Sequence, residues 1–295
     1  MERYDLGIDL GGTFLKYGLV DENYNVVENW KIRNIDFASK DELYDYVCAN
    51  IKNLDEIRHI GVSMPSVVDA DSNVKTAGMV KHLLGTNVSL EIGGRTGKKT
   101  AAIHDGKAAG LCELKLGNLV GTKSGAVVVL GTGTGGCITI GSEVWQGNDG
   151  LAGDILHLPV FKNNSKYERI GAYCGVNGLI GEYNKLVADE AKVEYGHDVC
   201  IKYLAGDENA KLAFGEWLMN LTSQLLIITT VYNSEVICIG GGISEETWII
   251  DLIRTKYNWR CEDFYMPNIV TTRIEKCKYN NDSNILGAVL NVNQH

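Results

Sequence analysis

Apolar and polar residues alternate along the N-terminal third of the chain in two periods, one typical of strands and one typical of helices. The strand-like segments are YDLGIDL and FLKYGLV, joined by the turn GGT, then VVENWKI, HIGVSMPS and KKTAAIHDG, which stops at Asp105. Residues 39–54 have apolar side chains at helical spacing behind Ser39, a residue type that caps helix N-termini. KAAGLCELKLG reads as a further helix that begins just after Asp105. The pattern predicts an α/β unit.

The second part of the chain repeats this plan. GAVVVLGTGTGGCITIG is a strand, a glycine-rich turn and a strand, and its turn is again built from glycine and threonine. Helical patterns follow at GLIGEYNKLVADEAK and GEWLMNLTSQLLIITTVYN, then a strand with a glycine turn in SEVICIGGGISEE and a short apolar helix in SNILGAVLNVNQH. The repeat predicts two α/β domains. We place the N-terminal domain at residues 1–106, joined by the C-terminal helix 283–295, and the C-terminal domain with the nucleotide site at 107–282.

Composition narrows the class of protein. Apolar residues make up 45% and charged residues 22% of the chain, as in an ordinary soluble globule. The net charge of −9 argues against a nucleic-acid or anionic-membrane partner. The sequence shows no leader-like start and no apolar run of about 18 residues, so we expect a cytoplasmic protein. The eight cysteines are scattered without a CxxC pair, which favours buried thiols over a zinc site.

Three glycine-rich turns, each at the end of a strand, are the main functional signal. They are Asp9–Thr13, Gly131–Gly136 and Gly240–Gly242. Glycine permits positive φ and close backbone approach, and amide groups exposed at such turns bind anions. One such turn is also what a tight hairpin needs. Three of them favour a nucleotide whose phosphates are held from two sides.

The carboxylate of Asp9 beside a phosphate-binding turn calls for a cation, because it would otherwise repel the phosphate. Asp9 is therefore predicted to hold Mg²⁺ through water, since Mg²⁺ keeps much of its hydration shell. Thr13 and the glycine amides would face phosphate oxygens, and Lys16 on the next strand could neutralise further charge. GGRTGKKT fails as a P-loop in its spacing, and GTGTGG fails as a dinucleotide fingerprint because a strand follows it.

The motifs DLGGT, LGTGTGG, LAGDILHLPV and IGGG, with the strand that ends in Asp105, occur in an order that resembles the ROK family of sugar kinases. This family belongs to the hexokinase–actin ATPase superfamily, and the resemblance covers nearly the whole chain. It implies two ribonuclease-H-like (actin-like ATPase) α/β domains flanking a cleft, with ATP against the C-terminal domain and the sugar between the domains. It also implies ATP and Mg²⁺ as cofactors, and we expect a homodimer.

The resemblance implies roles for individual residues. Asp105 matches the catalytic base, which must accept the proton of the sugar hydroxyl; taken alone, it would also suit a helix N-cap. The residues expected to contact the sugar are His104, Asp105, Asn148, Asp154 and His157. Those expected to contact ATP and its phosphates are Asp9, Gly11, Gly12, Thr13, Lys16, Gly131, Thr132, Gly133, Thr134, Gly135, Gly240, Gly241 and Gly242.

The departures from the family pattern concern the sugar side. The cysteine-rich zinc motif that often follows the His is reduced to Cys174, so we expect no structural zinc, and His157 becomes a sugar contact or a structural residue. His104 stands where the family has Asn, and Asp154 stands where it has the longer Glu. The sugar-side Asn is not recognisable in TAGMVKHLLGTNV. A zinc-free subgroup resembling β-glucoside kinase has a similar C-terminal end.

The sequence thus predicts ATP-dependent phosphorylation of a hexose or hexose derivative at the 6-hydroxyl, as in a glucokinase or β-glucoside kinase. The alternatives are an N-acetylhexosamine kinase, such as an N-acetylmannosamine kinase, and a non-catalytic sugar-binding regulator. Because DLGGT begins at Asp9, we expect no helix-turn-helix domain. The presence of Asp9, Asp105 and all three turns argues against a pseudokinase. The altered sugar side leads us to expect a substituted sugar rather than free glucose as the best substrate.

Overall fold

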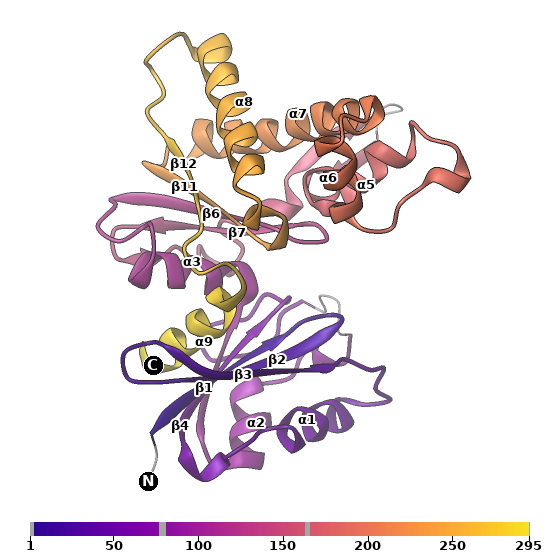
Figure 1. Cartoon of the computed structure of the whole chain (residues 1–295). Coiled ribbons are helices and arrows are strands. Elements are labelled where there is room, and N and C mark those ends of the chain that lie inside the picture. The colour runs from indigo at the N-terminus through magenta and orange to yellow at the C-terminus, as the bar shows by residue number, and fades with distance from the viewer. Residues whose placement is uncertain (1–2, 77–80, 163–165, 295) are drawn as a thin grey trace. The chain divides into compact units, whose positions relative to one another are not determined.

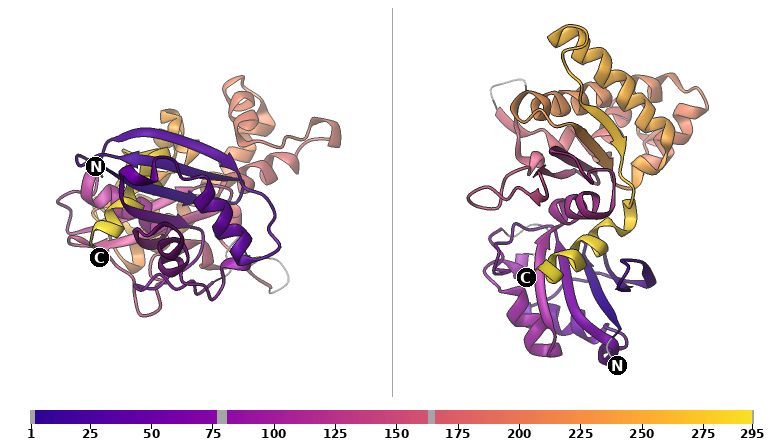
Figure 2. Two further views of the ribbon diagram at one scale, coloured as in Figure 1. Left: turned by 90° about the horizontal axis from the view of Figure 1, so that it is seen from below. Right: turned by 90° about the vertical axis from the view of Figure 1, so that its left-hand side faces the viewer.

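The computed structural model describes residues 3–76, 81–162 and 166–294, and its contacts divide the chain into two compact units (Figures 1 and 2). The first unit comprises residues 1–116, 143–152 and 281–295, and the second comprises 117–142 and 153–280. The sequence placed this boundary after residue 106, whereas the contacts group the helix that starts at Asp105 with the first unit. Residues 77–80, part of the segment TAGMVKHLLGTNV, lie outside the described residues.

The first unit is built on a five-stranded sheet in the order β3-β2-β1-β4-β5. Its strands are β1 (Tyr4–Leu10), β2 (Phe14–Val20), β3 (Val26–Arg33), β4 (Ile57–Met64) and β5 (Lys99–His104). The first three form antiparallel hairpins, and β4 and β5 run parallel to β1. The carboxyl ends of β1, β4 and β5 therefore meet at one edge of the sheet.

Helices cover both faces of this sheet (Figure 1). The helices α1 (Lys40–Ala49) and α2 (Val88–Thr96) lie on one face, and α9 (Ser283–Gln294), which also packs on α3 (Asp105–Leu116), lies on the other. Ser39 caps α1 as predicted, since its side chain accepts a hydrogen bond from the amide of Glu42. The helix ends at Ala49, earlier than residue 54, because Asn50 caps the carbonyl of Tyr46 and Asn53 turns left-handed at φ 53°.

A row of three glycines lets the C-terminal helix α9 approach the sheet closely. Gly7 on β1 is in register with Gly18 on β2 and with Gly61 on β4. A Cβ atom on Gly61 would lie 2.0 Å from the carbonyl oxygen of Ala288, and one on Gly7 would lie 2.6 Å from that of Ile285. Only glycine fits at these positions, because a side chain would push the helix away from the sheet.

The strands of the second unit form a sheet in the order β12-β11-β6-β7. Its strands are β6 (Ser124–Leu130), β7 (Thr134–Ile140), β11 (Val236–Gly240) and β12 (Arg273–Lys276). As in the first unit, an antiparallel hairpin stands beside parallel strands, because β11 runs parallel to both β6 and β12. A two-stranded ribbon is formed by β9 (Pro159–Lys162) and β10 (Lys166–Arg169).

The helices of the second unit enclose an aromatic core around the buried Trp217. They are α4 (Gly171–Cys174), α5 (Val176–Asn184), α6 (Gly196–Leu204), α7 (Glu208–Val231) and α8 (Thr247–Tyr265). The indole of Trp217 donates to the carbonyl of Cys174 at 2.9 Å. The predicted helix over GLIGEYNKLVADEAK is wrong beyond Asn184, because the Asn184 side chain bonds both backbone groups of Val193 and turns the chain back.

All eight cysteines lie among the described residues as thiols, seven buried and Cys48 partly buried. Burial raises the pKa of the Cys48 and Cys200 thiols to about 11. Within the described part of the chain, no helix is long and apolar enough to cross a membrane.

Candidate functional site

Asp9 lies near the carboxyl end of β1 as a largely buried carboxylate. It is in register with Lys16 on β2 and with Ser63 on β4. Its Oδ2 atom is 3.4 Å from the Lys16 ammonium, and its Oδ1 atom accepts a hydrogen bond of 3.2 Å from the Asn284 amide on α9. The carboxylate is therefore held by one cation and one amide, both within the first unit.

The turn after Asp9 is braced by Asn34, the residue that follows β3. The side chain of Asn34 donates to the Gly11 carbonyl at 2.8 Å, and its backbone amide donates to the Thr13 carbonyl at the same distance. A Cβ atom on Gly11 would lie 2.7 Å from the Phe14 carbonyl oxygen, so this position needs glycine. Gly12 and Thr13 are exposed. The structure thus keeps the predicted turn rigid while leaving its tip accessible.

Asp105 is the first residue of α3 and follows the last residue of β5 directly. Its Oδ1 atom accepts a hydrogen bond of 2.6 Å from the Gly106 amide and lies 3.4 Å from His104 Nε2. Its side chain is 36% exposed, which leaves the carboxylate within reach of a ligand. A carboxylate in the first turn of a helix is also stabilised in its charged form by the helix dipole.

Asp9 and His104 lie at the same edge of the first sheet, two strands apart, because β4 pairs with both β1 and β5. Strand spacing puts such positions about 10 Å from each other. Three buried polar atoms near this edge have no hydrogen-bond partner among the described residues: Ser63 Oγ, Ser66 Oγ and His104 Nδ1. Because buried polar atoms are normally paired, such a cluster is typical of a place where a polar ligand or water binds.

A cleft of about 820 Å³ opens within the first unit beside Asp105. His104 at the end of β5 and Lys107 on α3 line it together with the loop 146–151, which carries Asn148. Apolar side chains complete the wall, among them Val67 and Leu151. His104 and Asn148, two of the residues expected to contact sugar, thus share one cleft.

The two other glycine turns lie at one edge of the second sheet. Gly131–Gly133 connect β6 to β7, and Gly240 ends β11, the strand parallel to β6. Gly241 has φ 92°, and a Cβ atom there would lie 2.2 Å from the Leu130 carbonyl oxygen. The buried Ser244 donates to the Gly241 carbonyl at 2.7 Å. The structure therefore brings these two predicted phosphate and nucleotide turns side by side.

The turn after β6 is supported by the start of α5. The amides of Val176 and Asn177 donate to the carbonyls of Gly131 and Thr132, at 2.8 and 3.1 Å. A Cβ atom on Gly175 would lie 2.4 Å from the Gly133 carbonyl oxygen. Thr134 is buried at the start of β7, and the partly buried Gly135 follows it. Glycine is thus needed here for close packing, in addition to any role of its backbone amides in binding an anion.

Asp154 and His157 form a pair in the second unit, at the short 3-10 helix η3 (Ile155–His157). His157 Nδ1 lies 3.0 Å from Asp154 Oδ2, with the carboxylate 6% and the imidazole 47% exposed. Gly153, with φ 77°, precedes them, and a Cβ atom there would lie 2.6 Å from the Ile138 amide nitrogen. The two sugar-side residues predicted from LAGDILH are therefore in contact.

Sequence reasoning missed Gln224, a buried amide on α7. Its Nε2 atom donates to Thr134 Oγ1 at 3.1 Å and to the Ile155 carbonyl at 3.0 Å. It therefore ties the glycine turn to the segment that carries Asp154 and His157. A single Gln in an apolar helix offers no signal for this role. Asn284 and Asn34, which hold Asp9 and its turn, were also missed because their partners are distant in sequence.

The predicted residues fall into two groups. Asp9 to Lys16, His104, Asp105 and Asn148 belong to the first unit, and Gly131–Gly135, Asp154, His157 and Gly240–Gly242 belong to the second. Among the described residues, no three His, Cys, Asp or Glu side chains gather in a way that could hold a metal ion.

Comparison with known proteins supplies the class. A family model described as the ROK family matches residues 5–295, so the chain belongs to the ROK family. The β-glucoside kinase of Klebsiella pneumoniae is 22% identical to it over 291 residues, which cover 97% of this chain and 95% of that protein.

Two solved structures show the same fold. A ROK family protein of Streptococcus pneumoniae in complex with sucrose matches with a TM-score of 0.86 at 21% identity, covering 99% of this chain and 98% of that one. A ROK family glucokinase of Streptomyces griseus in complex with glucose and AMPPNP matches with a TM-score of 0.83 at 18% identity, covering 99% and 100%. The family resemblance and the predicted α/β fold class are thereby confirmed.

Proposed function

We propose that this chain is an ATP-dependent sugar kinase that phosphorylates a hexose or a hexose derivative at the 6-hydroxyl. The observation that carries the proposal is the position of Asp105, a partly exposed carboxylate between two residues that line the 820 Å³ cleft. Family membership and the kinase relatives support the same reaction.

Asp105 would act as the general base. As the sugar oxygen forms its bond to the γ-phosphorus of ATP, the bond to the β-phosphate oxygen breaks, ADP leaves, and the hydroxyl proton passes to the carboxylate. The hydrogen bond from the Gly106 amide fixes the orientation of this carboxylate at 2.6 Å. His104, 3.4 Å from the same oxygen, would contact the sugar next to the reacting hydroxyl.

The glycine turns and Asp9 would bind the phosphates of ATP and their magnesium ion. The accessible turn at Gly11, Gly12 and Thr13 would receive phosphate oxygens in the first unit, and the adjacent turns at Gly131–Gly135 and Gly240–Gly242 would receive the nucleotide in the second. Asp9 fits Mg²⁺ held through water, because Mg²⁺ is usually bound by one or two carboxylates with waters and substrate phosphates. When bound, the ion supplies neutralisation of phosphate charge. Lys16, 3.4 Å from Asp9, would add to it.

The size of the cleft supports a substituted sugar. Pockets for drug-sized ligands span about 300–1,000 Å³, so 820 Å³ leaves room for more than one hexose ring. The apolar wall at Val67 and Leu151 suits a non-sugar substituent. We therefore propose a β-glucoside or an N-acetylhexosamine as the preferred substrate, with Asn148, Asp154 and His157 as sugar contacts.

An ADP-release assay with Mg²⁺ and ATP over a panel of glucose, N-acetylglucosamine, N-acetylmannosamine and β-glucosides tests the proposal. We expect release with at least one sugar, and we expect Asp105→Asn to lower kcat by about 10²–10⁴ with sugar affinity within a few-fold. Asp263→Asn, an exposed carboxylate on α8, is the matched control and should behave like wild type. Sugar binding without ADP release by wild type would instead indicate a non-catalytic regulator.

Three further predictions of the sequence concern the assembly, location and metal content of the protein. We propose a homodimer, to be tested by light scattering of the purified chain, and a cytoplasmic location, to be tested by fractionation of cells that express it. We also propose that activity needs no zinc; loss of activity with a stoichiometric zinc removed by chelator would refute this.

A further inference from the structure

We propose that Lys107 is a positioning residue that holds the loop 146–151 against the first turn of α3 and so sets the sugar-side wall of the cleft. The effect on sugar use rests on the proposed kinase function, but the effect on the loop does not. The proposal concerns a residue that neither the motifs nor the family resemblance singled out.

The burial of Lys107 is the first observation. It is the third residue of α3, two positions after Asp105, and is only 2% exposed. Lysine is almost never fully buried unless its charge is paired or hydrogen-bonded. Its ammonium donates to Gln146 Oε1 at 2.5 Å and to the carbonyl of Gly150. Both acceptors belong to one loop, so the buried charge and the loop depend on each other.

The loop around Lys107 is the second observation. The backbone amide of Ala152 donates to the Gln146 carbonyl at 3.2 Å and closes the loop. Gly147 and Gly150 are both left-handed, at φ 68° and 76°. The loop contains no helix or strand, so its conformation depends on contacts such as these. A Cβ atom on Gly150 would lie 4.0 Å from the Lys107 ammonium and 3.2 Å from Val67, so the ammonium and the cleft wall meet at this glycine.

Because the loop 146–151 lines the cleft, its contact with Lys107 should affect how a sugar binds there. Lys107, His104 and Asn148 all line the same cleft. Asn148 is exposed, and its side-chain hydrogen bond goes to Asp149 within the loop. If the loop is loosened, a sugar must order it on binding, and the cost appears as weaker sugar binding. The step at Asp105 is not directly altered, so we expect KM for the sugar to change more than kcat.

Hydrogen exchange of the free protein tests the contact without any substrate. In Lys107→Met, we expect the amides of residues 146–152 to exchange about tenfold faster or more, because the loop loses the two hydrogen bonds that it accepts from Lys107. Lys107→Arg keeps the charge and should show a smaller increase. Lys115→Met, at an exposed lysine of the same helix, is the control and should leave these amides unchanged.

Gln146→Leu is a second test in case Lys107→Met does not fold. It removes one of the two acceptors of Lys107, and because Gln146 is exposed we expect the variant to fold. It should speed exchange in the same segment, by less than Lys107→Met. In the kinase assay, Lys107→Met should raise sugar KM about tenfold while kcat and the KM for ATP stay within about threefold. Unchanged exchange of residues 146–152 in Gln146→Leu, or in Lys107→Met where that variant folds, would overturn the proposal. Failure of the kinase function would show separately, as wild type without ADP release.

Discussion

Asp9 is held by side chains from opposite ends of the chain. Lys16 comes from the next strand, and Asn284 comes from a helix 275 residues away in sequence. Each contacts one carboxylate oxygen, and the two contacts together orient the side chain at the edge of the sheet. A carboxylate with fixed orientation suits the weakly coordinated, hydrated magnesium ion that phosphoryl transfer needs.

Asp9→Ala should raise the Mg²⁺ concentration for half-maximal rate more than it raises the sugar KM. The reason is that the carboxylate lies beside the turn Gly11–Thr13, the proposed phosphate turn, and is not among the residues that line the cleft proposed for the sugar. Initial rates over a Mg²⁺ titration at saturating ATP give the answer. Asn284→Ala removes a hydrogen bond but keeps the carboxylate, and it should have the smaller effect. An unchanged Mg²⁺ dependence in Asp9→Ala would assign Asp9 a structural role.

Asp154 and His157 make the corresponding pair in the second unit, with the carboxylate nearly buried. Asp154→Glu should shift the ratio of kcat/KM values from a substituted sugar toward glucose, because a carboxylate one methylene longer reaches about 1 Å further, enough to make or break a hydrogen bond of 2.7–3.0 Å. A polar group left unpaired by the wrong sugar costs about one to two decades in that ratio. If glucose ranks first for wild type and Asp154→Glu leaves the ranking unchanged, the proposal of a substituted sugar is wrong.

Helix α9 packs closely on the first sheet because Gly7, Gly18 and Gly61 have no side chains. Gly61→Ala should destabilise the protein by about 1–3 kcal/mol or more. Its Cβ atom would lie 2.0 Å from the Ala288 carbonyl oxygen, and this clash can be relieved only by moving the backbone. Gly94→Ala is the matched control: it is an exposed glycine of α2 with nothing within 4 Å of its Cβ position. That variant should stabilise by about 0.5–1 kcal/mol. Urea denaturation of both variants measures their free energies of unfolding. A value for Gly61→Ala equal to that of wild type would contradict the prediction.

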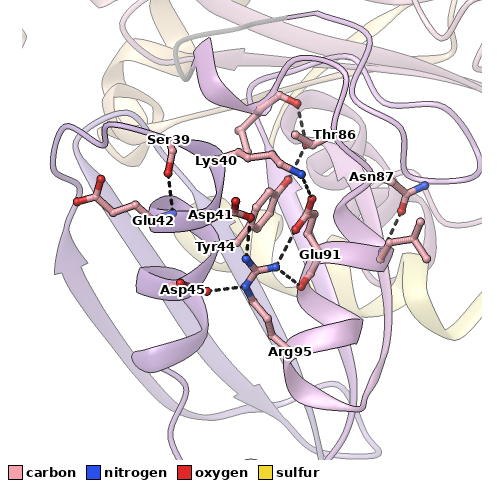
Figure 3. A network of polar contacts seen from close by, with 12 residues as sticks. Ser39, Lys40, Asp41, Glu42, Tyr44, Asp45, Thr86, Asn87, Glu91 and Arg95 are labelled. Carbon is pink, nitrogen blue, oxygen red and sulfur yellow. Dashed lines mark hydrogen bonds and ion pairs between the residues drawn. The ribbon is translucent and has the colours of Figure 1, made fainter.

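Helices α1 and α2 are joined by charges as well as by their apolar faces (Figure 3). Arg95 on α2 reaches Asp41 and Asp45 on α1 and Glu91 on its own helix, at 3.1, 2.7 and 2.7 Å. Glu91 also bonds Lys40 at 2.6 Å. The hydrogen bond from Lys40, together with that from Arg95, lowers the pKa of Glu91 below its ordinary value of 4.5.

Arg95→Met should lower the unfolding midpoint at pH 7 by about 2–4 °C. Because the pKa of Glu91 is lower in the folded state, its contribution is complete above pH 4.5 and is lost as the pH falls through the lowered pKa. The gap between wild type and Arg95→Met should therefore narrow between pH 5 and pH 3. Lys211→Met, which breaks an exposed pair with Glu208, is the control. A gap that stays constant over this range would count against the charge network.

Several structural features could be predicted from the sequence because they are local. The hairpins around DLGGT and LGTGTGG, the cap at Ser39 and the C-terminal apolar helix all depend on neighbouring residues. Helices α2, α6 and α8 and strand β12 were not predicted, because their apolar patterns are short or weak. The pairing of Asp9 with Asn284, of Lys107 with Gln146, and of β6 with β11 depends on residues far apart in sequence, and a pattern along one chain does not contain it.

The first unit is discontinuous, since its sheet comes from the start of the chain and α9 from residues 283–294. On the ribosome, β1 leaves the exit tunnel well before α9, the helix that covers its glycine row. At about 5–20 residues per second, the row stays bare for on the order of 15–60 s. The whole sequence of the second unit emerges during that time. A nascent chain must therefore carry an unfinished sheet until α9 has been synthesised, and only then can the first unit close.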